Sequence, residues 1–212
     1  MKMINKGTAP NSLVEHRTRE GGTYDNYSDK QAIRACLERE QRGICCYCMS
    51  RIKPTPAKMK IEHWKSQSAY AAHQLDYNNL LGACKGGEGQ AENKQYCDTC
   101  KKNKALSKNP ANPLHQIENF IHYKGDGTIF SNNEAFDKEL NEVLNLNVAF
   151  LVSNRKAVLD SFKMILTKKR GTLQKATLEK WLKEWSGEAN TGTLKPYCQV
   201  IVYWLKKRLK RA

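Results

Sequence analysis

The spacing of apolar residues makes the last third of the chain the most regular part of the sequence. Apolar positions recur there at intervals of three and four, the period of an amphipathic helix. The predicted helices cover 134–145, 151–169, 173–185 and 196–209. The C-terminal part of the chain is therefore expected to be a helical extension.

The N-terminal part carries shorter and less regular signals. Residues 1–27 show no clear period, and we expect them to form an arm that wraps another element or a partner. Ser28 and Gln31 resemble a capping box, and the apolar spacing that follows predicts a helix that ends at Gly43.

The middle of the chain alternates strand signals with loop signals. Residues 59–64 predict a short strand, and 85–95 are polar and glycine-rich, as expected of an exposed excursion. A short helix is predicted over 98–107. Two further strands, at 117–123 and 128–131, flank a Gly-Asp-Gly turn. Together these patterns predict an α+β fold that is mostly α.

The charge of the chain favours an anionic partner. There are 36 Lys and Arg residues against 21 Asp and Glu residues, a formal net charge of +15, and nucleic acid is the commonest partner of such a protein. Residues 151–212 carry 15 of the basic and 4 of the acidic side chains. We therefore expect a phosphate-binding surface there that includes Lys206, Lys207 and Arg208.

Membrane and secretion signals are not evident in the sequence. No apolar run reaches the roughly 20 residues that span a bilayer, and the first ten residues lack the apolar centre of a secretion signal. The sequence therefore predicts a cytoplasmic protein with no membrane partner.

Eight cysteines are many for a cytoplasmic protein, because disulfides do not persist in a reducing compartment. Cys45 and Cys48 form a CxxC knuckle, the spacing of a tetrahedral Zn²⁺ site. The second pair of thiolates has three candidates, which are Cys84, Cys97 and Cys100. One structural Zn²⁺ per chain is predicted, and such a site would contribute folding free energy directly.

A Glu-His pair and further polar residues lie among these cysteines. In order, the chain contains Cys45-x-x-Cys48, Glu62-His63, Asn79-Leu80, Cys84 and Cys97-Asp98-x-x-Lys101. In this order and spacing the chain resembles the HNH nucleases, whose catalytic unit is the ββα-metal fold. The resemblance implies a zinc-stapled nuclease core over 28–110, preceded by the arm at 1–27. Residues 111–212 would then form a hairpin plus a helical region that binds a partner or nucleic acid.

The residue types suit hydrolysis of a phosphodiester bond. His63, neutral at physiological pH, is expected to deprotonate the attacking water. Glu62 and Asp98 are expected to hold a catalytic Mg²⁺ or Mn²⁺, because hard carboxylates suit these cations. Asn79 would tie the loop that orients His63, and Lys101 is a candidate phosphate contact.

Two features depart from the HNH pattern. Family members have only two residues between their last two cysteines, whereas here the glycine-rich excursion intervenes, and Asp98 stands where the family has His or Asn. A second register would put both Cys97 and Cys100 on zinc and make Asn103 the ligand of the catalytic metal. We prefer Cys97 with Asp98, because Lys101 then also falls at its family position.

Within the HNH group, four motifs over residues 28–105 point to one subgroup. Cys-x-Tyr-Cys, Ile-Glu-His-Trp, Tyr-Asn-Asn-Leu-Leu and Cys-Asp-x-x-Lys resemble the PtuB-type endonucleases of Septu antiphage defence systems, some of which accompany retrons. The resemblance implies a PtuA-like ATPase of the ABC/SMC type as partner. In retron-linked versions it also implies a reverse transcriptase with its RNA-DNA hybrid.

A function of another class could use the same cysteines. A zinc-dependent binding module or adaptor would hold nucleic acid on the basic tail at 206–211 without cutting it. Glu62, His63 and Asp98 argue against this class, because carboxylates repel phosphate and serve a pure binder no purpose. The sequence leaves open whether the substrate is DNA or RNA.

Overall fold

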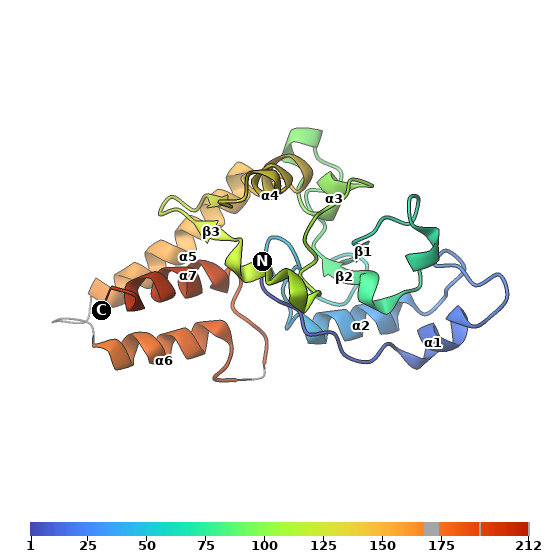
Figure 1. Cartoon of the computed structure of the whole chain (residues 1–212), viewed down its shortest axis with the longest axis horizontal. Helices are drawn as coiled ribbons and strands as arrows, with labels where there is room; N and C mark the ends of the chain where they lie inside the picture. Colours follow the sequence, from blue (N-terminus) through green and yellow to red (C-terminus); the bar gives the residue numbers. More distant parts are fainter. Residues whose placement is uncertain (168–173, 191, 212) are drawn as a thin grey trace.

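The computed structural model describes residues 1–167, 174–190 and 192–211, and within them the fold is α+β and mostly helical, as predicted (Figure 1). The helices are α1 (Asn11–Arg17), α2 (Lys30–Glu40), α3 (Asp98–Lys101), α4 (Glu134–Lys138), α5 (Ala149–Thr167), α6 (Lys175–Ser186) and α7 (Cys198–Leu209). Antiparallel pairing joins β1 (Lys60–His63) to β2 (Leu80–Ala83) and β3 (His122–Tyr123) to β4 (Ile129–Phe130). No helix in the described part of the chain combines the length and apolar character needed to cross a membrane.

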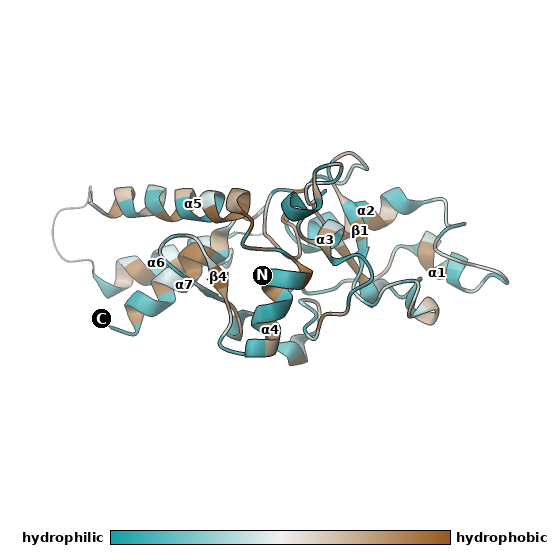
Figure 2. Ribbon diagram, turned by 90° about the horizontal axis from the view of Figure 1, so that it is seen from above, coloured by the Kyte–Doolittle hydropathy of each residue, from teal (hydrophilic) through white to brown (hydrophobic). Residues whose placement is uncertain are grey.

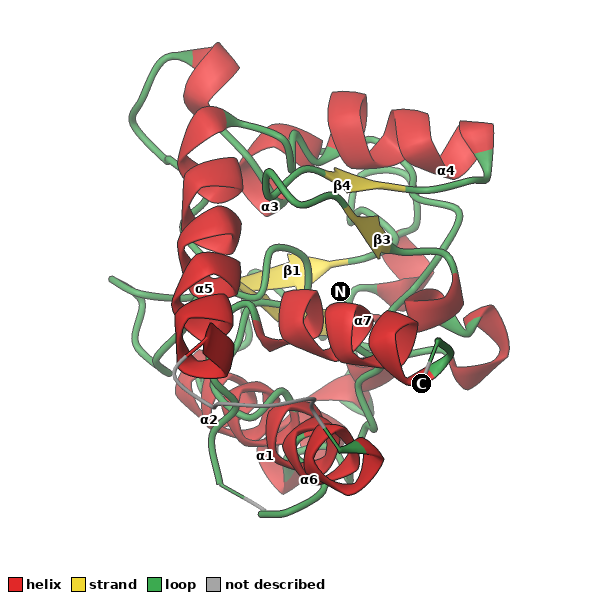
Figure 3. Ribbon diagram, turned by 90° about the vertical axis from the view of Figure 1, so that its left-hand side faces the viewer, coloured by secondary structure: helices red, strands yellow, loops and turns green. Residues whose placement is uncertain are grey.

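The elements gather at two ends of an elongated molecule. Figure 1 shows α1, α2, α3 and the β1–β2 sheet toward one end and α5, α6, α7 and the β3–β4 hairpin toward the other, with α4 between them. Figure 3 views the molecule from the helical end, where α7 lies beside both α5 and α6. We call these the cysteine end and the helical end.

The N-terminal arm is more ordered than its sequence predicts. It contains α1, and its first residues run through the centre of the molecule, where the Ile4 N–H donates to the Pro110 carbonyl at 2.9 Å. Lys6 Nζ lies 3.1 Å from Glu40 Oε2 of α2 in a buried ion pair. The arm therefore wraps elements of its own chain.

The first predicted helix is present as α2, but a different residue caps it. The Asp29 carboxylate, not the Ser28 hydroxyl, accepts from the Ala32 N–H at 3.1 Å, which satisfies one of the unpaired amides of the first turn. Just after α2, the Gln41 side chain accepts from the Gly82 N–H at 2.6 Å and donates to the Gly82 carbonyl at 2.7 Å. These two bonds fix α2 against β2.

Two other predicted elements are shorter in the structure. α3 ends at Lys101 instead of residue 107, because Lys102 adopts a φ of 52°, which a right-handed helix does not allow. The hairpin strands have two residues each. The buried Arg155 guanidinium fixes the hairpin turn by donating to the Gly127 carbonyl at 2.6 Å, and it also donates to the Leu146 carbonyl at 2.7 Å.

The helical end is built around one aromatic residue. Phe162 of α5 makes edge-to-face contacts with Trp181, Trp185 and Trp204, at centroid separations of 5.5, 5.6 and 5.8 Å. Figure 2 shows hydrophobic and hydrophilic residues alternating along α5, α6 and α7, the pattern from which the helices were predicted. The predicted helix boundaries at 169 and 173 lie outside the described residues.

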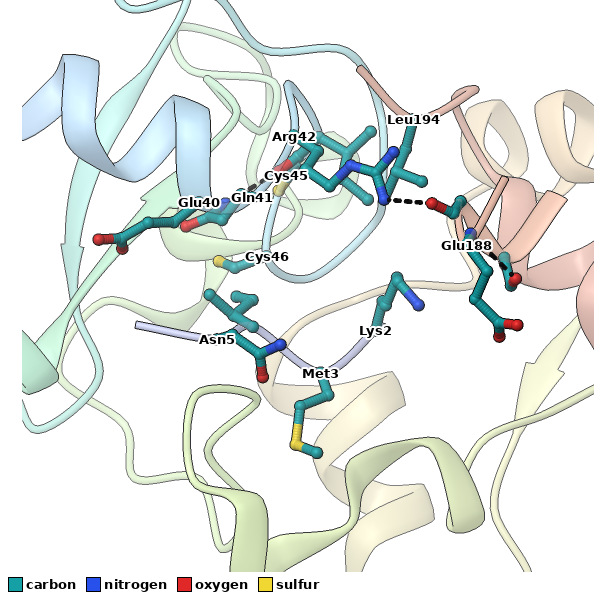
Figure 4. Close-up of a pocket in the computed structure, with 14 residues that line it drawn as sticks. Lys2, Met3, Asn5, Glu40, Gln41, Arg42, Cys45, Cys46, Glu188 and Leu194 are labelled. Carbon is teal, nitrogen blue, oxygen red and sulfur yellow. Dashed lines mark hydrogen bonds between the residues drawn. The ribbon is translucent and has the colours of Figure 1, made fainter. Parts of the chain in front are cut away.

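The two ends share one apolar core and a polar seam. Buried apolar side chains run from Met1 of the arm to Leu205 of α7. At the seam, the Arg42 guanidinium donates to the carbonyls of Gly187 and Gly192 at 2.9 and 2.8 Å. A cavity of about 220 Å³ lies there, between the first residues of the arm and the segment after α6 (Figure 4).

Candidate metal centre and active site

Four cysteine thiols converge at the cysteine end. Cys45, Cys48, Cys84 and Cys97 are buried, and their sulfur atoms all lie within 4.8 Å of one another. The Sγ–Sγ distances are 3.9 Å for Cys45–Cys97 and 3.7 Å for Cys48–Cys84. Zn–S bonds of about 2.3 Å in tetrahedral geometry put sulfurs about 3.8 Å apart, whereas a disulfide needs about 2.05 Å. The four thiols can therefore hold a metal ion such as Zn²⁺.

This set distinguishes the two registers left open by the sequence. Cys97 is the fourth member of the cluster, and Cys100 lies half-buried outside it. Asn103 is exposed beyond the end of α3. Cys46 is buried but is not one of the four, and its backbone N–H donates to the Gly82 carbonyl at 3.0 Å. The preferred grouping of Cys45, Cys48, Cys84 and Cys97 is the one the structure adopts.

The glycine-rich excursion returns the chain to the cluster. After residue 85 it runs over the surface, and it closes where the Tyr96 N–H donates to the Gly86 carbonyl at 2.9 Å. Gly86 has a φ of +54°, and a Cβ on it would lie 2.1 Å from the Tyr96 carbonyl oxygen, so only glycine fits. Cys97 is then held by its N–H bond to the Leu144 carbonyl at 2.8 Å. These backbone hydrogen bonds bring Cys97 to the cluster despite the long insertion between Cys84 and Cys97.

Two carboxylates lie together on β1 and α3. Glu62 is only 2% exposed and pairs in register with Leu81 of β2, while Asp98, the first residue of α3, keeps 19% of its side chain exposed. Burial, followed by interaction with the Asp98 carboxyl group, raises the pKa of Glu62 well above its usual value. Two carboxylates this close repel each other, and a divalent cation between them would remove the repulsion.

Lys101 is not the surface phosphate contact that the sequence predicts. Its side chain is fully buried, with Nζ 2.8 Å from Glu62 Oε1, and it donates to the His63 carbonyl at 3.1 Å. The Tyr47 hydroxyl donates to the same Glu62 oxygen at 2.8 Å. A buried carboxylate needs such partners, so Lys101 neutralises Glu62 from inside the core.

Asp98 faces a second lysine that is more exposed. Lys60 Nζ lies 3.4 Å from Asp98 Oδ2 and 3.0 Å from Glu88 Oε1, with 24% of the Lys60 side chain exposed. Lys60 and Glu62 share one face of β1 because side chains alternate along a strand. Lys60 has access to solvent, so its ammonium group can leave Asp98 when another cation binds there.

His63 is the last residue of β1 and has a defined tautomer. Nε2 lies 3.0 Å from the Gln74 carbonyl oxygen, which can only accept, so Nε2 carries the proton and Nδ1 carries the lone pair. Burial lowers the pKa of His63 below its usual value, against the opposing effects of the Gln74 hydrogen bond and the Asp98 charge. The ring is therefore neutral at physiological pH, with Nδ1 as its basic atom.

Asn79 ties the loop between the two strands. Its Oδ1 accepts from the Lys65 N–H at 2.7 Å, and its Nδ2 donates to the carbonyls of Lys65 and His73 at 3.0 and 3.1 Å. The Asn79 carbonyl also accepts from the Trp64 N–H at 3.0 Å. These bonds hold both sides of the loop that carries Gln74, the hydrogen-bond partner of His63.

Sequence reasoning missed Tyr24 of the N-terminal arm. Its ring meets the His63 ring edge-to-face at a centroid separation of 4.4 Å, and its N–H donates to Gln74 Oε1 at 3.0 Å. Burial raises the pKa of Tyr24 to about 12, so the phenol stays neutral. One residue, Gln74, therefore holds both the arm and the histidine. No spacing pattern within residues 1–27 indicates this contact, because it is purely tertiary.

The other predicted nucleic-acid-binding residues lie far from this site. Lys206, Lys207 and Arg208 are exposed in the last turns of α7, at the opposite end of the molecule from β1 (Figure 1). Lys207 and Arg208 line a cavity there, whereas Lys206 does not.

No protein-family model and no curated protein matches this chain. Within the described residues, the four cysteines are the one group of three or more His, Cys, Asp or Glu residues close enough to share a metal ion. Glu62 and Asp98 are only two carboxylates and so do not form such a group, although Mg²⁺ in phosphate-processing enzymes is often held by only one or two carboxylates.

Proposed function

We propose that the protein is an HNH (ββα-metal) endonuclease that hydrolyses phosphodiester bonds of nucleic acid with the help of a divalent cation. The observation that carries this proposal is the state of His63, whose Nε2 is bound to the Gln74 carbonyl while Nδ1 keeps its lone pair. Glu62 precedes His63 on β1, and Asp98 of α3 interacts both with the Glu62 carboxyl group and with the His63 ring, in the chain order β1, β2, α3. Hydrolysis needs a positioned base and a cation site, and we assign these roles to His63 and to the two carboxylates.

Each side chain has a distinct part in the reaction. Nδ1 of His63 takes a proton from the attacking water, and the bond from Nε2 to Gln74 keeps the ring oriented as its charge develops. Glu62 and Asp98 would hold Mg²⁺ or Mn²⁺, which when bound supplies positive charge to the phosphate oxygens and the leaving oxygen. Lys101 favours the ionised form of Glu62, against burial and the Asp98 carboxyl group, which raise its pKa. Asn79 preserves the loop geometry on which His63 depends.

Cleavage of supercoiled plasmid and of labelled RNA by zinc-loaded protein tests the proposal, with and without added Mg²⁺ or Mn²⁺. His63→Ala should lower the rate by about 10²- to 10⁴-fold, the usual contribution of a general base. Zinc content and the thermal unfolding midpoint should stay as in the wild type. His73→Ala is the matched control, because His73 lies on the same loop and is more exposed. Unchanged cleavage by His63→Ala would refute the assignment.

A non-catalytic nucleic-acid-binding module is the second candidate, and the Glu62–Lys101 ion pair favours it. That pair gives the buried carboxylate a partner without any metal ion. Mn²⁺ titration followed by electron paramagnetic resonance separates the two functions. A nuclease should bind Mn²⁺ in a way that Asp98→Asn weakens, whereas a pure binder should bind nucleic acid and show no specific Mn²⁺ site.

On the motif resemblance we further propose that the nuclease is the effector of an antiphage complex with an ABC/SMC-type ATPase. α5 exposes the adjacent apolar residues Met164 and Ile165, at 60% and 52%, and apolar surface of this kind suits protein contact. Co-purification with an ATPase encoded beside the gene should be lost in Met164→Lys/Ile165→Lys. It should survive in Ser161→Lys, which adds charge at an exposed position of the same helix.

A further inference from the structure

A second cavity lies at the helical end, away from the candidate active site. It has a volume of about 540 Å³ and is formed by α5, α7 and the β3–β4 hairpin. Figures 1 and 3 show these three elements side by side. Ligand cavities commonly measure about 300–1,000 Å³, so this one has room for a nucleotide-sized molecule.

The lining of this cavity is strongly basic. Among the described residues that line it, the cationic ones are Lys124, Lys163, Lys207, Arg208 and Arg211, and none is Asp or Glu. Of the five, Lys163 has a carboxylate neighbour, Asp160 on the same helix, at 3.9 Å. A concave surface lined by positive charges attracts anions more strongly than a flat one, because its low-dielectric walls focus the electric field.

Aromatic rings form part of the same wall. Tyr203 and Trp204, adjacent on α7, are half-buried and line the cavity. Both rings pack edge-to-face against neighbours, Tyr203 against Tyr123 and Trp204 against Phe162, each at a centroid separation of 5.8 Å. The Arg208 guanidinium lies 5.1 Å from the Trp204 ring centroid. Rings held rigidly beside cations are the combination that binds bases together with their phosphates.

We propose that this cavity binds a nucleoside phosphate, either as a free nucleotide or as one unit of single-stranded nucleic acid. The phosphate oxygens would lie against Lys207, Arg211 and Lys163, and the base would lie against the wall formed by Tyr203 and Trp204. The inference stands whether or not the protein cuts phosphodiester bonds, because none of these residues belongs to the β1–β2–α3 unit.

The C-terminal end of α7 and the turn after it supply a matched pair of variants. Lys207 and Arg211 are four residues apart and line the cavity, whereas Lys206 and Lys210 have the same spacing and do not. All four are exposed, so their replacement leaves the core intact. Lys207→Ala/Arg211→Ala and Lys206→Ala/Lys210→Ala each remove one charge from α7 and one from the turn, but they differ in their relation to the cavity.

The experiment measures fluorescence anisotropy of a labelled twelve-nucleotide oligothymidylate at fixed salt, with the full chain. Lys207→Ala/Arg211→Ala should weaken binding by about tenfold or more, as expected when two phosphate contacts are lost. Lys206→Ala/Lys210→Ala should weaken it by less than about threefold. Equal losses in both variants would overturn the proposal, since binding would then follow net charge and not the cavity.

Competition identifies the ligand. Unlabelled oligothymidylate should compete better than a duplex of the same length and better than inorganic triphosphate, because neither of these presents an accessible base. Competition by thymidine monophosphate or ATP at lower concentration than the oligonucleotide would assign a free nucleotide. Competition by inorganic triphosphate equal to that of every nucleotide would overturn the role of the aromatic wall and with it the proposed ligand class.

Discussion

Different interactions stabilise the cysteine end and the helical end. At the cysteine end β1, β2 and α3 have four residues each, and the space between them is filled by four thiols and the Glu62–Lys101 pair. At the helical end α5, α6 and α7 have 19, 12 and 12 residues, and aromatic rings surround Phe162. The candidate chemistry therefore lies where thiolates and buried charges fix the geometry, not where packing does.

Loss of one cluster thiol should have the largest effect and separate the two ends. Structural zinc contributes about 10–16 kcal/mol in small zinc domains, which matches or exceeds the roughly 5–15 kcal/mol that stabilises a whole protein. Cys97→Ser should therefore lose the metal and unfold the cysteine end first, while α5, α6 and α7 keep their circular dichroism. Cys100→Ser should keep one zinc per chain. Atomic emission measures the zinc content and hydrogen exchange measures local unfolding. Zinc loss from Cys100→Ser but not from Cys97→Ser would show that Cys100, and not Cys97, is the zinc ligand.

The corresponding experiment at the helical end removes the Phe162 ring. Phe162 is 2% exposed and meets three tryptophan rings, so Phe162→Ala should lower the free energy of unfolding by about 3–5 kcal/mol. Its zinc content should not change, because the rings that Phe162 contacts belong to α6 and α7. Met164→Ala, on the exposed face of the same helix, should have little effect on denaturant midpoints. Zinc loss in Phe162→Ala would show that the two ends do not hold independently.

Removing Lys101 probes the buried charges of the cysteine end. Lys101→Met leaves Glu62 without its cation, a change that costs up to about 3–5 kcal/mol, part of which is relieved when Glu62 takes up a proton. The folded-state pKa of Glu62 is raised above its usual value of 4.5. The contribution of Glu62 to the free energy of unfolding is therefore greatest below pH 4.5 and is lost as the pH rises through the folded-state pKa. The loss in Lys101→Met should therefore grow with pH. Addition of Glu62→Gln should recover part of it, and exposed Lys102→Met serves as control.

Local patterns predicted the parts of this site that depend on spacing, and missed those that depend on tertiary contact. The CxxC knuckle, Cys84, Cys97 and the Glu62-His63 step follow from order along the chain, and the four thiols do converge. The burial of Lys101 does not follow from that order, because the local sequence is the same whether this lysine is exposed on α3 or buried under β1. The Asp29 cap and the early end of α3 likewise depend on backbone angles that the residue types only bias.

The smallest predicted effect concerns Tyr24 and tests whether the arm belongs to the active site. Burial lowers the pKa of His63 below 6.5. The neutral base therefore persists below pH 6.5 and is protonated only as the pH falls through the folded-state pKa. A bound cation would lower this pKa further. Tyr24→Ala exposes the ring and should move the acid limb of the cleavage rate up toward 6.5, by less than about one unit. Tyr24→Phe keeps the ring contact and should leave the limb in place. A rate that drops equally at every pH in Tyr24→Ala would mean that the ring positions His63 without shielding it, and the arm would then serve catalysis through the Gln74 bond alone.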